Sequence, residues 1–441
     1  MKKSRGKRPV TASVISSTVI RFGVDRVIEQ PDRVPSSLFS GAWGMVTNDA
    51  ARRPVPSAGA IDRNAVTDAG NDADPLAHPD HLSRKALLDA GVPLKQLFAP
   101  EHGISAAGAD GQAMQDDRDP VTGLPVCSLY GERMRPPAEL LDPLDGLLFD
   151  IPDIGTRFYT YIWTLSHVME ACADADKPLV VLDRPNPIGG ELMAAEGPIL
   201  DTRNCAGFLG RAPIPVRHSL TIGEFARWLA SFWKLDLDLV VVPVKGWKRA
   251  MYWPDTHLPF VPTSPAIPSF ESALCYPGTA LFEATNVSAG RGTLLPFQQI
   301  GAPWLRAAEV VAEIADAVAL PGVRFAGNNF RPVEHPWKGE QCRGIRLVVT
   351  DRNAFRPVRT GLALLAVIRR LHPDLFSWKT YPTAANPSGE GHFERLIGRN
   401  DIRPDLQLAP EDFLQKLPER LETPSWVSET RDFLLYNNNH K

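Results

Sequence analysis

The sequence predicts an α/β protein with two domains: a mostly parallel sheet covered by helices, followed by a smaller α+β domain. Three observations predict this architecture. A chain of 441 residues exceeds what one hydrophobic core usually organises. Short β-rich runs alternate with helical patterns over about the first 260 residues. This alternation ends at a proline-rich stretch.

Six apolar runs in the first part of the chain are expected to form strands. They are GMVTN (44–48), LKQLFAP (94–100), PVCSLY (125–130), LDGLLFDI (144–151), PLVVLD (178–183) and LDLVVVPV (237–244). Between the fourth and fifth runs, apolar side chains recur at helical spacing, at Phe158, Tyr161, Ile162, Leu165, Met169 and Cys172. Strand, helix and strand in this order predict a mostly parallel sheet with helices on both faces.

The stretch VPTSPAIPSF after Phe260 indicates a domain boundary. We therefore assign residues 1–262 to the sheet domain and 263–441 to the α+β domain. In the second domain we expect helices at 305–319 and 359–371, a strand at 344–350, and further helices from 410 to 435. Residues 49–79 are poor in large apolar side chains and are predicted to form a polar loop or insertion.

Composition excludes several classes of protein. The chain has 48 Lys and Arg against 51 Asp and Glu, so nucleic acid is not an expected partner. Five widely spaced cysteines form no CxxC pair, which argues against a disulfide framework and a thiolate zinc site. No apolar run approaches the roughly 20 residues that span a bilayer. The basic N-terminus makes a poor signal peptide, so we expect a cytoplasmic protein; a periplasmic or secreted one is the alternative if the true start encodes a signal. No feature indicates an oligomeric state.

Polar residues that follow the predicted strands are the first candidates for a site, because parallel sheets bind ligands beyond the carboxyl ends of their strands. They are Asn48, Glu101, His102, Tyr130, Asp150, Asp153, Asp183, Arg184 and Asn186. The stretch LFAPEHG allows two interpretations. Glu101 either accepts backbone amides while His102 packs, or it is a general acid whose pKa is raised by desolvation.

The stretch EHGISAAGADG has the glycine spacing of a phosphate loop but lacks its cation. Ala109 and Asp110 stand where Lys and Ser or Thr are required. No GxGxxG motif occurs in the chain. Kinase, ATPase and dinucleotide-binding functions are therefore disfavoured.

Three further stretches carry candidate binding groups. In DIPDIGTRFYTY, Asp153 either caps the following helix with Arg157 on its surface, or Arg157 grips a substrate carboxylate while Tyr159 and Tyr161 contact a ring. LDRPNPIGG is predicted to be a rigid loop that positions binding groups. LFEATNVSAGRGT reads as a wall of the interdomain cleft and supplies Glu283, Asn286, Ser288 and Arg291.

Taken together, the sequence resembles the NamZ-type exo-β-N-acetylmuramidases from roughly Thr18 to Tyr436. The blocks that carry the resemblance are LFAPEHG, TGLPVCSLYG, LDGLLFDIPDIGTRFYTYIWTL, VLDRPNPIGG, AEGPIL, PIPVRHSLTIGE, YPGTALFEATNVSAGRGT and PFQQIGAPW. The resemblance implies a Rossmann-like N-terminal domain, a smaller C-terminal domain and an active site in the cleft between them. It also implies removal of terminal N-acetylmuramic acid from the non-reducing end of peptidoglycan fragments.

The family's proposed catalytic glutamate matches Glu101, which the resemblance makes the expected general acid. We place His102, Asp153 and Asp183 with it as catalytic candidates. Asp153, Asp183 or Glu283 is expected to activate water, unless the substrate's own 2-acetamido group is the nucleophile. The candidate substrate-binding residues are Asn48, Arg157, Tyr159, Tyr161, Asn186, Glu283, Asn286 and Arg291. No metal or organic cofactor is expected.

Muramic acid carries a lactyl carboxylate that glucosamine lacks, so selectivity requires a cation. Arg157 is the first choice and Arg291 the second. Four stretches depart from the family pattern and are expected to alter the pocket lining: CAGFLG (205–210), SPAIPSF (264–270), HSL (218–220) and IPD (151–153). Two other functions remain open at this point, a non-catalytic amino-sugar or muropeptide-binding protein and a nucleotide-sugar transferase.

Overall fold

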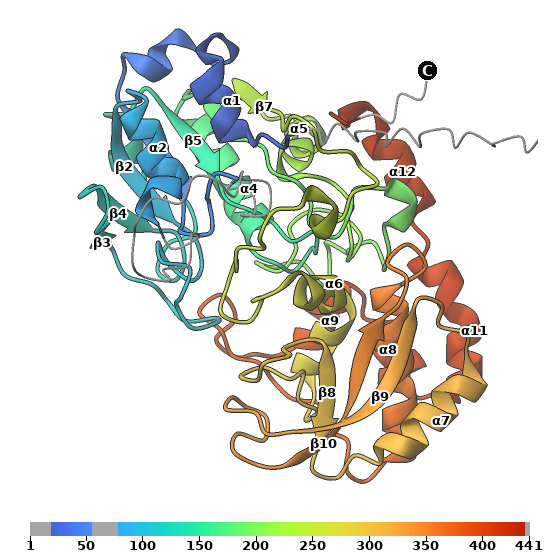
Figure 1. Cartoon of the computed structure of the whole chain (residues 1–441). Helices are drawn as coiled ribbons and strands as arrows, with labels where there is room; N and C mark the ends of the chain where they lie inside the picture. The colour runs from blue at the N-terminus through green and yellow to red at the C-terminus, as the bar shows by residue number, and fades with distance from the viewer. Residues whose placement is uncertain (1–18, 55–77, 437–441) are drawn as a thin grey trace, which may run out of the picture.

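The chain forms two sheets, each with its own helices. The computed structural model describes residues 19–54 and 78–436, so most of the predicted loop at 49–79 lies outside the described residues. A seven-stranded sheet lies at the upper left of Figure 1, and a three-stranded sheet lies at the lower right. The predicted α/β class, with a larger parallel sheet first, is confirmed.

The large sheet has the strand order β3-β4-β2-β1-β5-β6-β7, and all neighbours are parallel except β3 and β4. Its strands are β1 (Trp43–Thr47), β2 (Leu94–Ala99), β3 (Asp117–Arg118), β4 (Pro125–Ser128), β5 (Gly146–Asp150), β6 (Leu179–Leu182) and β7 (Leu239–Val242). All six predicted strands are present. β3 was not predicted because it is two exposed charged residues long.

Helices cover both faces of this sheet, as predicted. Successive residues of β1 show why: Met45 packs in one apolar cluster and Val46 in another, and their partners in β5, Leu148 and Phe149, divide in the same way. Each strand is therefore apolar on both sides. The covering helices are α1 (Gly23–Glu29) and α2 (Ser83–Asp89) on the first face, and α4 (Tyr161–Asp174) and α5 (Ile222–Trp233) on the second, with the short α3 (Ala138–Leu141) before β5.

The second domain is built on an antiparallel sheet of order β8-β10-β9. Its elements are α6 (Phe270–Thr279), β8 (Gln299–Ala302), α7 (Ala307–Ala317), β9 (Val323–Phe330), β10 (Cys342–Val349), α8 (Pro357–Leu371), α9 (His392–Ile397), α10 (Ile402–Asp405), α11 (Pro410–Leu421) and α12 (Pro424–Thr430). The predicted elements α7, β10, α8, α11 and α12 are confirmed. β8 and β9 were not predicted, because β9 contains Gly327 and two asparagines instead of a β-branched run.

The end of the chain crosses back to the first domain, where α12 lies beside α5 (Figure 1). The hydroxyl of Tyr436 donates a hydrogen bond to Asp183 at 2.5 Å and accepts one from the Val244 amide at 2.8 Å. The indole of Trp426 donates to the His218 carbonyl at 2.8 Å. The second domain is therefore tied to the first at both of its ends, and the boundary at residue 262 stays a prediction.

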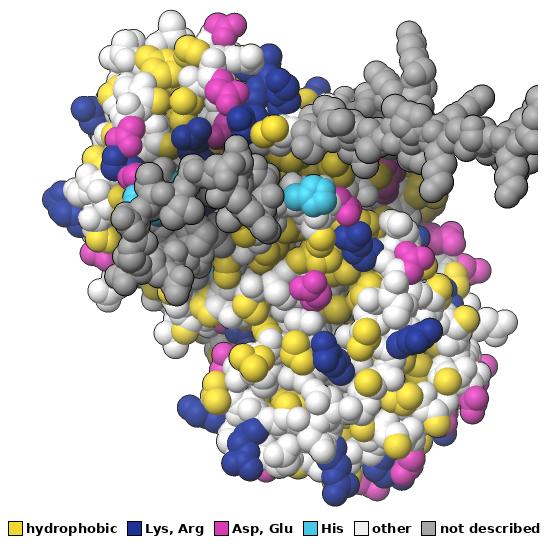
Figure 2. Space-filling model, in the orientation of Figure 1, with side chains coloured by type: hydrophobic (Ala, Val, Ile, Leu, Met, Phe, Trp, Pro, Cys, Tyr) yellow, Lys and Arg dark blue, Asp and Glu magenta, His cyan; other side chains and the backbone are white. Residues whose placement is uncertain are grey.

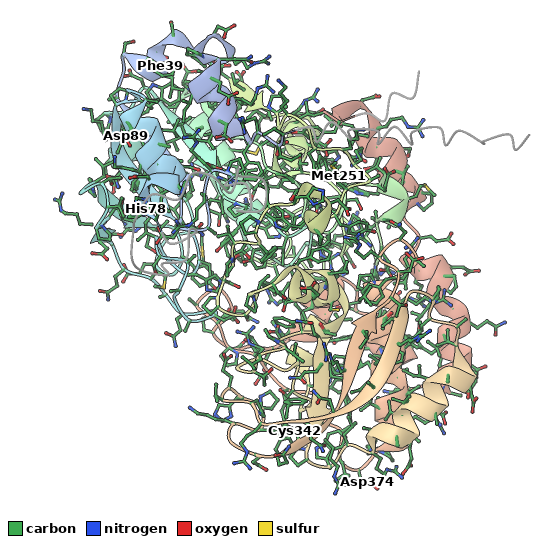
Figure 3. All side chains as sticks on the ribbon, viewed as in Figure 1. Phe39, His78, Asp89, Met251, Cys342 and Asp374 are labelled. Atoms are coloured by element: carbon green, nitrogen blue, oxygen red, sulfur yellow. The ribbon has the colours of Figure 1, made fainter. Side chains whose placement is uncertain are left out.

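All five cysteines are free and buried. Cys342, labelled in Figure 3, lies in β10 of the second domain. Among the described residues, no helix is both long enough and apolar enough to cross a bilayer. On the face shown in Figure 2, Lys and Arg side chains are interspersed with Asp and Glu.

A buried arginine joins the two domains. Arg157 has no exposed surface, and its guanidinium donates to the carbonyls of Pro198 at 2.9 Å, Ile214 at 3.0 Å and Leu396 at 2.7 Å. Leu396 belongs to α9 of the second domain, whereas the other two carbonyls belong to the first. Burial lowers the pKa of Arg157 to about 9, so the guanidinium keeps its charge at neutral pH.

We expect Arg157→Met to lower the free energy of unfolding by about 3 kcal/mol or more, because three buried carbonyls lose a charged donor. Urea unfolding followed by tryptophan fluorescence measures the loss. The matched control is Arg135→Met, which removes an exposed ion pair with Asp174 and should change the free energy by less than about 0.5 kcal/mol. Equal stabilities of the two variants would contradict this role of Arg157.

Candidate active site

A cleft between the two domains is lined by ionisable and aromatic side chains from both domains. It encloses about 740 Å³ of space, part of which is open to solvent. From the first domain its lining includes Glu101, His102, Asp110, Tyr130, Tyr159, Thr160, Phe208 and Leu209. From the second domain it includes Tyr276, Glu283, Arg291, Tyr381, His392 and Arg395. The predicted interdomain cleft is therefore present.

Glu101 lies at the wall of this cleft, two residues after the end of β2. Its side chain is buried, with one carboxylate oxygen accepting the Gly111 amide at 2.9 Å and the other accepting the Thr160 hydroxyl at 2.7 Å. Burial raises the pKa of Glu101, and the charge of Asp110 raises it further. His102 and the two hydrogen bonds oppose this rise without cancelling it. The carboxyl accepts a backbone amide, as the first interpretation expects, and it also faces the cleft with a raised pKa; its role as general acid stays a prediction.

His102 holds the loop that follows β2 in its bent conformation. Its φ of 70° is in the left-handed region, and its Nδ1 lies 2.8 Å from the Gly108 carbonyl, which can only accept. Nδ1 therefore carries the proton. The Gly108 amide donates to the His102 carbonyl at 3.0 Å, and the Gly111 amide is used by Glu101. Two amides of this glycine-spaced loop already have protein acceptors, which agrees with the missing phosphate-loop cation.

Asp110 is the neighbour of Glu101 that sequence reasoning missed. Oxygen atoms of the two carboxylates lie within 4.8 Å of each other. The side chain of Asp110 is 31% exposed, accepts the Tyr381 hydroxyl at 2.6 Å and lies 3.6 Å from Arg291. Burial raises its pKa, but Arg291, Tyr381 and the nearby histidines together hold it below the usual value. The pKa values of the two carboxyls are therefore shifted in opposite directions, upward for Glu101 and downward for Asp110.

Arg291 and Glu283 form the opposite wall of the cleft. Arg291 pairs with Glu283 at 2.8 Å, with Glu334 at 3.2 Å and with Asp110. Burial raises the pKa of Glu283 to about 7, Arg291 opposes the rise and Asp110 adds to it. The predicted cleft wall is thus built, and three carboxylates share the one guanidinium of Arg291.

Tyr159 also lines the cleft, whereas Tyr161 and Asn48 lie behind it. The Tyr159 hydroxyl donates to the Thr263 hydroxyl at 2.7 Å, and the Tyr161 hydroxyl donates to the Thr263 carbonyl at 2.7 Å. The Asn48 side chain donates to the Tyr161 hydroxyl at 3.0 Å. This chain of hydrogen bonds supports the cleft from the sheet, and only Tyr159 of the three is placed to contact a ligand.

Two of the predicted binding residues are corrected by their geometry. The side-chain amides of Asn186 and Asn286 are used by backbone groups: Asn186 donates to the Leu220 carbonyl and accepts the Ile188 amide, and Asn286 donates to the Leu375 carbonyl and accepts the Ser377 amide. Neither side chain lines the cleft.

Arg157 is corrected as well. It is neither on the helix surface nor in the cleft, because three buried carbonyls occupy its guanidinium. The first choice for a carboxylate-binding cation is therefore wrong.

The predicted catalytic aspartates are corrected too. Asp183 is fully buried and accepts bonds from the Thr221 hydroxyl, the Gly223 amide and Tyr436. It fixes the start of α5, and burial raises its pKa to about 7. Asp153 accepts the Gly155 amide at 2.7 Å and faces a different, mainly apolar cavity beside Phe22 and Trp253. Neither carboxylate lines the cleft that contains Glu101.

Some cleft residues were marked by a local pattern in the sequence, and others were not. Asp110 stood in a stretch that was compared only with a phosphate loop, whereas Tyr130 was already among the candidates that follow the predicted strands. Burial, then the charges of Glu101 and Asp110, raises the pKa of Tyr130, so its hydroxyl stays protonated. Tyr381 comes from the loop after α8, and His392 is the first residue of the short helix α9, so no local sequence signal marked them.

Glu101, His102 and Asp110 are close enough to hold one metal ion, since their ligand atoms lie within 4.8 Å of one another. Each carboxylate accepts a hydrogen bond from the protein, however, and Nδ1 of His102 bonds the Gly108 carbonyl. The geometry adds nothing that requires a metal, and the expected absence of one stays a prediction.

Comparison with known proteins identifies the family of this chain. Residues 70–271 match the N-terminal domain of the exo-β-N-acetylmuramidase NamZ, and residues 274–436 match its C-terminal domain. The chain belongs to the NamZ family. The junction of the two NamZ domains thus falls between residues 271 and 274, close to the predicted boundary at 262.

Individual relatives agree with membership of the NamZ family. The peptidoglycan β-N-acetylmuramidase NamZ of Bacillus subtilis (strain 168) is 43% identical over 316 residues, which are 72% of this chain and 73% of the relative. A DUF1343 family protein of Bacteroides fragilis NCTC 9343 is 28% identical in its crystal structure, with a TM-score of 0.78 over 95% of this chain and 99% of that one. A second DUF1343 family protein of that strain, 24% identical with a TM-score of 0.64 at the same coverage, shares the fold.

Proposed function

We propose that this NamZ family glycoside hydrolase removes terminal N-acetylmuramic acid from the non-reducing end of peptidoglycan fragments, with Glu101 as its general acid. Membership of the family and the named activity of the Bacillus subtilis relative support the reaction. The observation that supports this role of Glu101 is the opposite pKa shift of Glu101 and Asp110 in the cleft. The pKa of Glu101 is raised, while that of Asp110, within 4.8 Å, is lowered.

The surroundings of Glu101 suit an acid that must first hold a proton and then release it. Burial and the charge of Asp110 raise the pKa of the carboxyl, which favours its protonated form before reaction. As the glycosidic bond breaks, the proton passes to the departing oxygen, and the carboxylate that forms is stabilised by the Gly111 amide and the Thr160 hydroxyl. The same two donors prepare the carboxylate to accept a proton from water in the second half of the reaction.

The second catalytic role, attack on the anomeric carbon, is assigned to groups near Asp110. Inverting glycosidases separate their carboxyl groups by roughly 6.5–9.5 Å to admit a water molecule, whereas one oxygen of Glu101 and one of Asp110 lie within 4.8 Å of each other. We infer that the substrate's 2-acetamido oxygen attacks the anomeric carbon while the ionised Asp110 accepts the acetamido N–H. Glu283 lines the same cleft but is held by Arg291.

Replacing Glu101 with Gln is expected to reduce kcat/KM on a natural N-acetylmuramyl disaccharide about 100- to 10,000-fold, the usual contribution of a general acid. The loss should be much smaller on 4-nitrophenyl β-N-acetylmuramide, because nitrophenol departs without protonation. The matched control is Glu139→Gln, on the exposed surface of α3. This substitution should leave kcat/KM unchanged on both substrates.

Equal losses on the two substrates, or none, would contradict the assignment of Glu101 as the acid. Tight sugar binding by well-folded wild-type protein without turnover of either substrate would instead favour the amino-sugar-binding alternative. Stabilisation of the fold by a uridine diphosphate sugar, but not by muramides, would favour the transferase.

The pH profile of kcat/KM should fall on its alkaline side as Glu101 ionises, since the acid must carry its proton. Asp110→Asn removes a negative charge that raises the pKa of Glu101, so the fall should move to lower pH. Thr160→Val removes a hydrogen bond that lowers this pKa, so the fall should move to higher pH. Each shift should be about 0.5–1 pH unit.

Glu283 provides the control for this assignment, because its pKa of about 7 falls in the same range. An alkaline fall that both substitutions leave in place, and that Glu283→Gln removes, would contradict the role given to Glu101.

A further inference from the structure

Two arginines line the cleft, and their surroundings differ. Arg291 is paired with Glu283, Glu334 and Asp110, so its charge is already compensated. Arg395 projects from α9 on the same face as His392 and Leu396, and all three residues line the cleft. Among residues 19–54 and 78–436, no carboxylate lies within 4.0 Å of its guanidinium and no group is hydrogen-bonded to it.

The guanidinium of Arg395 lies in a defined place although it has no polar partner. Its Nη1 is 2.5 Å from the position that a Cβ atom would take at Gly207, so the glycine leaves the space that the guanidinium fills. Phe208 and Leu209, the next two residues, line the same cleft. Beside Arg395, burial lowers the pKa of His392 to about 4, so this histidine is neutral near pH 7. Arg395 is therefore an uncompensated cation with an apolar surface beside it.

We propose that Arg395 binds the lactyl carboxylate of N-acetylmuramic acid and is the residue that selects this sugar over N-acetylglucosamine. The proposal rests on the proposed function. The lactyl group consists of a carboxylate and a methyl group, which match the guanidinium and the Phe208–Leu209 surface. Arg291, the second choice from the sequence, would have to give up a carboxylate partner to do the same. A planar guanidinium binds a carboxylate through two parallel hydrogen bonds, which favours this anion over a neutral hydroxyl.

The test compares three 4-nitrophenyl glycosides: the β-N-acetylmuramide, its lactyl methyl ester and the β-N-acetylglucosaminide. We expect the wild type to prefer the free acid to the ester. Arg395→Gln should lower kcat/KM for the free acid about 10- to 100-fold, mainly through KM, because the lactyl group is remote from the bond that breaks. Activity on the ester should change less than about threefold, so the acid-to-ester ratio should approach one.

A second variant reaches the same guanidinium without replacing it. The Cβ of Gly207→Ala would meet only the end of the Arg395 side chain within 4 Å, and Gly207 is not in the left-handed region, so the backbone accepts alanine. We expect a smaller fall in the acid-to-ester ratio with unchanged unfolding temperature. The control is Arg399→Gln, one turn further along and paired with Asp401, which should behave as the wild type.

The proposal is overturned if Arg395→Gln keeps the wild-type acid-to-ester ratio, if the wild type itself does not distinguish acid from ester, or if Arg291→Gln alone abolishes the distinction. Failure of the proposed function has a different signature, since the wild type would then cleave none of the three glycosides. In that case calorimetric binding of free N-acetylmuramic acid and its methyl ester to wild type and Arg395→Gln still decides the role of Arg395. Equal binding of the acid by both proteins overturns it.

Discussion

The buried guanidinium of Arg157 is the constraint on which the cleft depends. Its three acceptors lie 41, 57 and 239 residues away in the sequence, so one side chain fixes two loops of the first domain and α9 of the second. A charge without access to water needs all of its partners, which makes this arrangement costly to disturb. Three residues after Arg157, Thr160 contacts Glu101, and one residue before Leu396, Arg395 faces the cleft. The acid and the proposed selectivity residue are thus positioned by the same interaction.

The ionisable groups of the cleft differ in how far neighbouring charges and hydrogen bonds compensate them. Asp110 accepts a hydrogen bond from Tyr381 and faces the charge of Arg291, which lower its pKa, whereas the more deeply buried Glu101 has a raised pKa. Glu283 is close to the same cation, but its side chain is largely buried, so its pKa also rises. Arg291 therefore serves mainly to compensate the carboxylates, and Arg395 is left with its charge available. This division gives each of the two arginines a different role in one small volume.

Sequence reasoning succeeded where the signal is local. The parallel sheet followed from six short apolar runs, and Glu101 followed from its place after β2 together with its family motif. It failed where the partners of a side chain come from distant segments. Arginine and aspartate are residue types that suit a binding site. In the folded chain, however, Arg157 binds backbone carbonyls as distant as that of Leu396, and Asp183 accepts a hydrogen bond from Tyr436, 253 residues away, so both have structural roles. Arg395 sits in a short helix with no distinctive motif, so only the folded cleft sets it apart.

The central claim is that Glu101 holds its proton near neutral pH until a substrate takes it. The most direct measurement is an NMR titration of protein labelled with ¹³C at the glutamate side-chain carboxyls, with Glu101 assigned from the signal lost in Glu101→Gln. The account predicts a carboxyl that titrates clearly above the usual glutamate pKa of about 4.3 and shifts downward in Asp110→Asn. A Glu101 signal that is fully ionised by about pH 5 would contradict it.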